Sequence, residues 1–162
     1  MELIIIRGTP GSGKSSLGRR LKKSYPAGVL LEVDNFRGMM NDVNWEDEHQ
    51  HLVALDVIAS SAKKFLELKR SPIIIVDMFL PEKLEWFLEK VKGINYTVIS
   101  LLVNEPVLQK RLAERKEGFK NISKGILINK FIQDNPCDKE LIIDTSDLDK
   151  NAISEKCKVF LK

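Results

Sequence analysis

Gly8-Thr9-Pro10-Gly11-Ser12-Gly13-Lys14-Ser15 follows the apolar run Leu3-Ile4-Ile5-Ile6 and precedes a segment with helical spacing from Leu17 to Leu21. This glycine-rich stretch matches G-x-x-x-x-G-K-[ST] at every fixed position. Glycines allow a tight turn with inward-pointing backbone N–H groups, and the next helix adds its positive N-terminal end. The pattern predicts a polyphosphate site formed by residues Gly8 to Ser16. Lys14 is expected to reach the β- and γ-phosphates and Ser15 to bind Mg²⁺.

Length and composition favour one globular domain spanning residues 1–162, since 43% of its 162 residues are hydrophobic and 30% are charged. No apolar run approaches the roughly 18 to 20 residues that span a bilayer, and the N-terminus does not resemble a secretory signal. We therefore expect a cytoplasmic protein with no membrane partner. Cys137 and Cys157 lack C-x-x-C spacing and a nearby histidine, which predicts ordinary thiols.

Charge is unevenly distributed although the net charge is only +3. Residues 1–24 carry six Lys/Arg against one Glu, and residues 107–130 carry seven against two acids. Residues 32–56 hold seven Asp/Glu against Arg37 alone. Clustered basic charge is typical of proteins that bind phosphate or nucleic acid, and a bound nucleoside triphosphate would account for it here. Solvated helix faces are the alternative for any single lysine.

Strands and helices alternate along the chain, which predicts right-handed βαβ units and an α/β fold with a five-stranded parallel sheet. Apolar or β-branched runs predict strands, and apolar residues at helical spacing predict helices. The strands are expected at 3–6, 29–33, 72–77, 96–103 and 140–144. The helices are expected after Lys14, over 46–70, from Pro81 to Gly93, from Pro106 to Arg115, and over 123–133 and 150–161.

Asp34 is the first candidate for chemistry, because it follows a predicted strand at the edge where ligands bind in open α/β sheets. A carboxylate there could take the proton of an attacking hydroxyl. Arg37, three residues later, could hold the acceptor or steady the base. The alternative is an Asp that caps the following turn, with Arg37 in solvent.

Asp77 ends the most apolar predicted strand, the position of a metal-side carboxylate in many phosphate-loop proteins. It could equally cap the next turn. Arg111 and Arg115 share a helix face, so one of them could point at the γ-phosphate, or both could be solvated. His49 and His51 lie beside acids, but an i, i+2 pair does not share a helix face, so we assign them no role.

These residues together resemble the small P-loop kinases that phosphorylate hydroxyls: polynucleotide kinase domains, chloramphenicol phosphotransferase and zeta-toxin-like kinases. The resemblance is carried by the glycine-rich stretch, Asp34-x-x-Arg37, Ile73-Ile74-Ile75-Val76-Asp77-Met78-Phe79-Leu80 and Arg111-x-x-x-Arg115. It implies a three-layer fold with a short lid at about 115–124, in which Arg115 is the lid arginine. It also implies that Asp144-Thr145-Ser146 borders adenine, which makes Thr145 a nucleotide-binding candidate.

The resemblance implies an ATP- and Mg²⁺-dependent kinase with Lys14, Asp34, Arg37 and Arg115 as catalytic residues. The preferred acceptor is a hydroxyl of a small molecule. A nucleic-acid 5′ end is the second candidate, and the acidic stretch 32–56 argues against it, since a strand-binding groove is basic and aromatic. A nucleotide switch or ATPase without an acceptor is the third. The sequence leaves the oligomeric state open.

Overall fold

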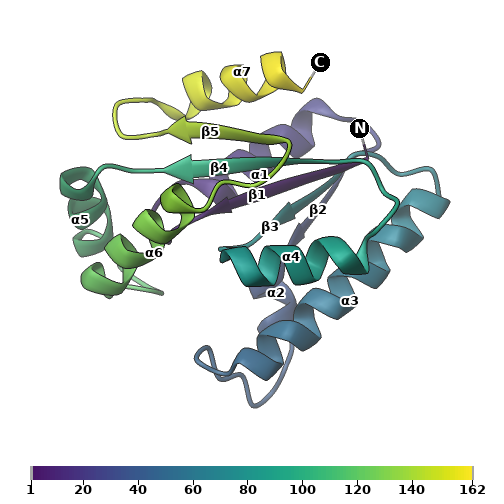
Figure 1. Ribbon diagram of the computed structural model, residues 1–162, viewed down its shortest axis with the longest axis horizontal. Coiled ribbons are helices and arrows are strands. Elements are labelled where there is room, and N and C mark those ends of the chain that lie inside the picture. The colour runs from purple at the N-terminus through teal and green to yellow at the C-terminus, as the bar shows by residue number, and fades with distance from the viewer. Residues whose placement is uncertain (1, 162) are drawn as a thin grey trace.

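A computed structural model describes residues 2–161, and Figure 1 shows helices on both sides of one sheet. In chain order the elements are β1 Leu3–Gly8, α1 Lys14–Ser24, β2 Val29–Glu32, α2 Val33–Arg37, α3 Glu48–Glu67, β3 Ile73–Val76, α4 Pro81–Lys90, β4 Tyr96–Leu102, α5 Glu105–Ala113, α6 Ile122–Asp134, β5 Glu140–Asp144 and α7 Lys150–Phe160. Within residues 2–161, none of these helices combines the length and apolar character needed to cross a bilayer.

The sheet has five parallel strands in the order β2-β3-β1-β4-β5, which confirms the predicted sheet. β1 is central, and Ile5 pairs with Ile75 of β3 and with Val98 of β4. Because all five strands run the same way, their carboxyl ends share one edge. The glycine-rich loop after β1 therefore emerges beside the segment after β3, where Asp77 lies.

Side chains of β1 alternate between two cores, which makes the fold three-layered as predicted. Leu3 and Ile5 face one side, where α3 and α4 supply residues such as Leu55 and Phe87. Ile4 and Ile6 face the other side, covered by α1 and α7. All four β1 side chains are fully buried, as expected for a strand in a parallel sheet covered on both faces. In Figure 1, α5 lies beyond the carboxyl ends of the strands, and α6 runs back alongside β1 and β4.

The segment after β2 differs from the prediction. Strand β2 ends at Glu32, and Val33 begins the short helix α2, so Asp34 lies in a first helical turn and not at a strand end. An acid is favoured there by the helix dipole. Helix α3 begins at Glu48 and not at residue 46, because the side chain of Asp47 caps it by accepting from the backbone N–H groups of His49 and Gln50.

A buried ion pair joins the central strand β1 to the edge strand β5, next to the glycine-rich loop. Arg7, the residue before Gly8, is fully buried and donates to Glu140 of β5 through Nη2 at 2.7 Å and Nε at 3.0 Å. Arg7 also donates to Ser100 of β4 at 2.6 Å and to the backbone carbonyl of Asn135 at 2.9 Å. The pair therefore anchors β1, immediately before the loop, to β4 and β5.

Candidate functional site

The loop from Gly8 to Lys14 has the conformation that phosphate binding requires. Gly11 and Gly13 have φ of 90° and 96°, in the left-handed region that side chains disfavour. Gly13 is the N-cap of α1 and offers no side-chain cap, and the first turn of α1 holds no acid. The first N–H groups of α1 therefore remain available, and its positive end is not neutralised. This is an anion site built from backbone.

Two threonines brace the loop from inside. The hydroxyl of Thr9 is buried and donates to the carbonyl of Gly125 in α6 at 2.8 Å. Thr145 is also fully buried, and its hydroxyl lies 3.3 Å from the carbonyl of Ser12 and 3.1 Å from that of Leu102. Thr145 was expected to contact the nucleotide. Because its side chain is buried against the loop, it supports the loop's shape and does not line the open surface.

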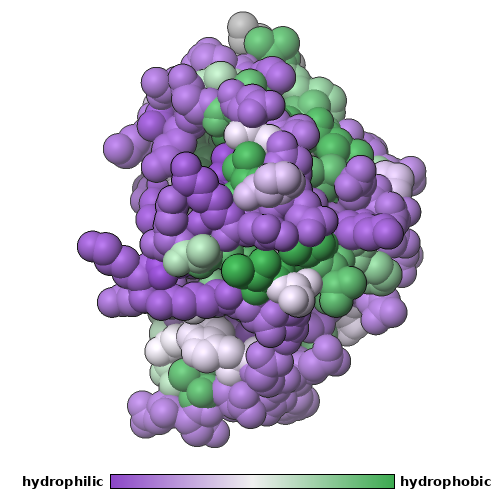
Figure 2. Space-filling view, turned by 90° about the vertical axis from the view of Figure 1, so that its left-hand side faces the viewer, coloured by the Kyte–Doolittle hydropathy of each residue, from purple (hydrophilic) through white to green (hydrophobic). Residues whose placement is uncertain are grey.

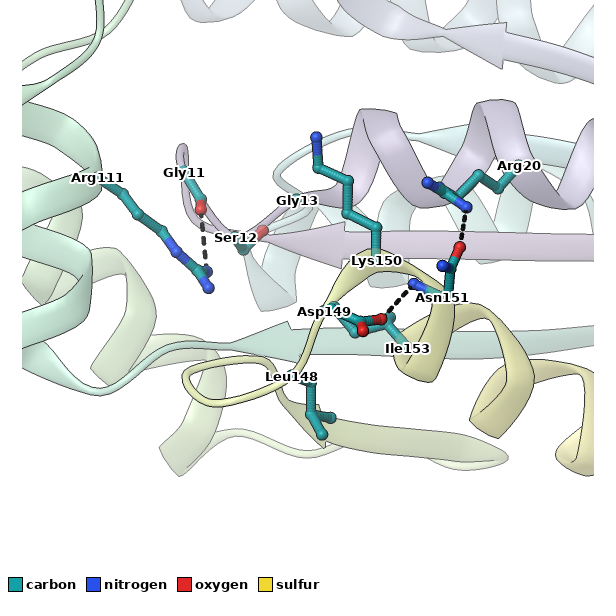
Figure 3. A pocket seen from close by; sticks show the side chains of 10 residues that line it. All are labelled: Gly11, Ser12, Gly13, Arg20, Arg111, Leu148, Asp149, Lys150, Asn151 and Ile153. Carbon is teal, nitrogen blue, oxygen red and sulfur yellow. Dashed lines mark hydrogen bonds between the residues drawn. The ribbon is translucent and has the colours of Figure 1, made fainter.

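An open pocket of about 620 Å³ lies between the glycine-rich loop and the start of α7 (Figure 3). Arg111 of α5 forms one wall and donates to the carbonyls of Thr145 at 2.8 Å and Gly11 at 3.4 Å. Arg111 thus ties the segment after β5 to the loop. The remaining lining residues are Ser12, Gly13, Arg20, Leu148, Asp149, Lys150, Asn151 and Ile153.

On the other side of the loop, charges of Lys14, Asp34 and Asp77 act on one another. Burial lowers the pKa of Lys14 from its ordinary value, although Asp77 and then Asp34 oppose the shift. The charge of Arg115 lowers the Lys14 pKa further. Of the two arginines considered for the γ-phosphate, Arg115 therefore lies within electrostatic reach of Lys14, whereas Arg111 lines the pocket beside Gly11.

The two aspartates have opposite electrostatic environments. Partial burial of its carboxyl group raises the pKa of Asp34 although the residue as a whole is exposed, and the negative charge of Asp77 raises it further, while Lys14 and Arg37 oppose the shift. Burial alone would raise the pKa of Asp77 as well, but the hydrogen bond with His51, the backbone N–H of Met78 and the charge of Lys14 act in the opposite direction, and the pKa is lowered. Asp34 is exposed and Asp77 is buried. Asp34 is therefore the more basic carboxylate and the one open to a ligand.

His51 was assigned no role from the sequence, yet it lies beside Asp77. Its Nε2 is 2.8 Å from Oδ2 of Asp77, and both residues are buried. Its Nδ1 is 3.1 Å from Nζ of Lys83 in α4, and Lys83 in turn lies 3.5 Å from Oε1 of Glu48. His49 is exposed, as expected for an i, i+2 neighbour. The signal for His51 was its position four residues before buried Leu55, on the apolar face of α3.

Arg37 is buried and fastens the loop between α2 and α3. Its Nη2 donates to the backbone carbonyls of Asn44 at 2.9 Å and Asp47 at 3.4 Å, and its guanidinium lies 4.9 Å from the ring centre of Trp45. Arg37 therefore does not lie in solvent, which was the alternative considered from the sequence. Arg37 acts on Asp34 through its charge, while its hydrogen bonds shape the loop that follows.

The residues at the carboxyl edge fit Mg²⁺ bound together with a nucleotide. Asp77 offers a carboxylate whose lowered pKa keeps it ionised, and Ser15 offers a hydroxyl in the first turn of α1. Both are hard oxygen ligands, which Mg²⁺ prefers. Among residues 2–161, no three His, Cys, Asp or Glu side chains form a metal site by themselves. Mg²⁺ commonly uses one or two protein ligands with phosphate oxygens and water, so two are sufficient.

Comparisons with known proteins identify the class. A family model described as an AAA domain matches residues 4–136, so the chain belongs to this family. Its fold is that of the P-loop kinases, which confirms the resemblance seen in the sequence.

Figure 2 views the molecule from the side of α5 and α6, and this face is largely hydrophilic with scattered apolar patches.

Two relatives match in sequence. The chain is 32% identical over 171 aligned positions to a nucleotide-binding protein of Dechloromonas aromatica, matching all of this chain and 54% of the relative. It is 37% identical over 73 residues to human NEDD4-binding protein 2, matching 45% of this chain and 4% of the relative. The chain thus spans about half the length of the first relative and a small part of the second.

Three solved structures share the fold. They are a sugar kinase from Janibacter sp. (TM-score 0.75, 15% identity, 99% of this chain and 95% of that one), a gluconokinase from Sinorhizobium meliloti (0.71, 19%, 99% and 91%) and the APS kinase of Mycobacterium tuberculosis in complex with AMPPNP and APS (0.72, 18%, 99% and 96%). At these identities the likeness shows the fold alone.

Proposed function

We propose that this protein is an ATP-dependent kinase that transfers the γ-phosphoryl group to a hydroxyl of a small molecule. The observation that carries the proposal is the exposed Asp34, with a raised pKa, within electrostatic reach of Lys14 at the end of the phosphate loop. A nucleotide switch needs the loop and a metal ligand but has no use for a second, more basic carboxylate. The gluconokinase, sugar kinase and APS kinase that share this fold agree with the proposal.

ATP is proposed to bind with its phosphates against the N–H groups of Gly8 to Ser16 and its nucleoside in the pocket beside Arg111. Lys14 then contacts the β- and γ-phosphates. Arg115 adds positive charge near the γ-phosphate, where charge develops in the transition state. Arg37 contributes indirectly, by shaping the loop beside Asp34.

Mg²⁺, when bound by Ser15 and Asp77, neutralises charge on the β- and γ-phosphates. Asp34 takes the proton of the acceptor hydroxyl while the hydroxyl oxygen forms a bond to the γ-phosphorus. The bond from the γ-phosphorus to the β–γ bridging oxygen breaks, and ADP leaves with that electron pair. Asp34 is suited to this step because its pKa is raised, which makes it a stronger base than an ordinary carboxylate.

A screen of small alcohols and 5′-hydroxyl oligonucleotides for ADP formation above the acceptor-free rate tests the proposal. For a good acceptor, the dependence of KM on salt then identifies the class. A nucleic-acid strand gives a steep rise of log KM with log salt because counterions are released, and a small uncharged alcohol gives a slope near zero. We expect the shallow slope. A good oligonucleotide substrate with a steep slope would contradict the small-molecule assignment.

A further inference from the structure

The contacts between α3, α4 and the end of β3 form a buried polar chain that phosphate binding does not require. Asp77, His51, Lys83 and Glu48 follow one another at 2.8, 3.1 and 3.5 Å, from the candidate metal ligand to the surface. Asp77 and His51 are 6% and 4% exposed. Buried polar groups are kept only where they are well paired, so this chain has a specific geometry to maintain.

The partners fix which nitrogen of His51 carries the proton. A lysine ammonium has donors and no acceptor, so the Nδ1 atom facing Nζ of Lys83 is the acceptor of that hydrogen bond. In a neutral imidazole the other nitrogen is then the donor. Nε2–H of His51 therefore donates to Oδ2 of Asp77. Lys83 determines the tautomer, and the tautomer determines how the carboxylate is held.

The backbone between Asp77 and Lys83 is shaped to close this contact. Phe79 has φ of 45°, in the left-handed region that a bulky residue rarely adopts, and its side chain is fully buried. Pro81 then begins α4, which places Lys83 in the first helical turn. Unusual backbone of this kind is held in place by its surroundings and is concentrated near functional sites.

We propose that His51 is a positioning residue that fixes the orientation of the Asp77 carboxylate through its contact with Oδ2, and thereby sets how this carboxylate is presented to the metal. Lys83 holds His51 in the tautomer that this requires. The inference rests on one part of the proposed function, that Asp77 is a ligand of the metal ion bound with the nucleotide. Partners behind a metal ligand commonly change metal affinity or activity by about 10- to 100-fold when removed.

The tautomer is tested directly in the metal-free protein. The chain has two histidines, so His49→Ala leaves His51 as the only imidazole, and His49 is exposed. Two-bond ¹H–¹⁵N correlation spectra then show which ring nitrogen carries the proton. We expect hydrogen on Nε2 and a bare Nδ1. Hydrogen on Nδ1, or rapid exchange between the two tautomers, would overturn the inference.

The effect on metal binding is tested by titrating Mn²⁺ into the protein saturated with ADP. Electron paramagnetic resonance measures the Mn²⁺ that remains free, which gives the affinity. His51→Leu removes the donor and is expected to weaken Mn²⁺ binding by about 10- to 100-fold. His51→Gln can place an amide N–H where Nε2 was and should stay close to wild type. His49→Leu is the matched control and should change nothing.

Wild-type affinity in folded His51→Leu, or a loss in His51→Gln as large as in His51→Leu, would show that His51 does not act through Asp77. If His51→Leu does not fold, the tautomer measurement and the Mn²⁺ titration of His51→Gln still test whether His51 acts through Asp77. Neither readout needs turnover. A protein that phosphorylates no acceptor would refute the proposed kinase activity and leave this inference to be judged on its own measurements.

Discussion

Removing Glu140 is expected to destabilise the protein strongly, because it leaves the positive charge of Arg7 unpaired in the core. The side chains of Arg7 and Glu140 are 0% and 2% exposed. Glu140→Ala deletes the acceptor of two guanidinium N–H groups and also the acceptor of the Cys137 backbone N–H, which donates to it at 2.8 Å. Nη1 of Arg7 already lacks a partner among the described residues. Few other groups can therefore take over the charge.

Breaking a buried ion pair from one side costs about 3–5 kcal/mol. Whole domains are stable by only about 5–15 kcal/mol, so Glu140→Ala should remove a large part of the stability. Urea unfolding followed by circular dichroism measures the loss. Glu155→Ala is the control: it breaks the exposed Lys158–Glu155 pair on α7 and should shift the free energy of unfolding by no more than about 0.5 kcal/mol.

The double variant Arg7→Met/Glu140→Leu removes both charges and should lose less stability than Glu140→Ala alone. A cost below about 1 kcal/mol for Glu140→Ala would refute the reasoning, since that is the range of surface ion pairs. A double variant less stable than the single variant would refute it as well, because the stranded charge would then not be the cause.

Three other substitutions and one labelling experiment have defined outcomes. Lys14→Ala should abolish ATP turnover while circular dichroism shows a folded protein, because Lys14 contributes charge to the phosphates and little to the core. Arg115→Ala should lower kcat by about 10³-fold and change ATP affinity, measured by calorimetry, much less; equal losses would indicate a ground-state contact. Asp34→Asn should lower phosphoryl transfer by about 10²- to 10⁴-fold and raise Tm at neutral pH. The folded-state pKa of Asp34 is raised above its ordinary value, so wild-type Asp34 lowers stability progressively as the pH rises from the ordinary carboxyl pKa to the folded-state pKa. The Tm gain of Asp34→Asn should therefore vanish below the ordinary carboxyl range. An unchanged Tm at neutral pH would contradict this. Burial raises the pKa of Cys137 to about 11 and of Cys157 to about 12. Both thiols should therefore react slowly with a thiol reagent at pH 8 until urea is added. Rapid labelling of the native protein would contradict this.

The sheet and the glycine-rich loop were predictable because their signals are local. Four apolar residues before Gly8 are enough to indicate a buried strand, and the spacing of Gly13 and Lys14 indicates the loop. Asp34 and Asp77 could be placed at one edge because the carboxyl ends of parallel strands share it. Strand order was not predictable, since which strands pair depends on long-range packing.

The features that the sequence did not reveal are contacts between distant residues. Arg7 and Glu140 are 133 positions apart, and His51 and Asp77 are 26 apart. The spacing of His51 to Leu55 indicates that His51 lies on the apolar face of α3, but it does not reveal the partner of its ring. The same holds for Thr145: the sequence shows that it follows β5, but not that its hydroxyl points inward toward Ser12.

Helix α2 was not predicted, and the start of α3 was predicted imprecisely because capping competes with hydrophobic spacing. Apolar spacing suggested a helix from residue 46, whereas the cap formed by Asp47 starts the helix at Glu48. Val33 looked like the end of a strand because it is β-branched and ends a mostly apolar run, and in the structure it is fully buried within α2. Its place in α2 moves Asp34 into a helical turn without removing it from the edge of the sheet.

The central claim is that the γ-phosphoryl group passes from ATP to a hydroxyl. ³¹P NMR of wild-type protein with ATP, Mg²⁺ and the best acceptor from the screen measures this transfer directly. The account predicts one phosphomonoester for every ADP formed, no accumulation of inorganic phosphate, and loss of the phosphomonoester signal in Asp34→Asn. ADP and inorganic phosphate appearing in equal amounts, at the same rate with and without acceptor, would identify an ATPase and contradict the claim.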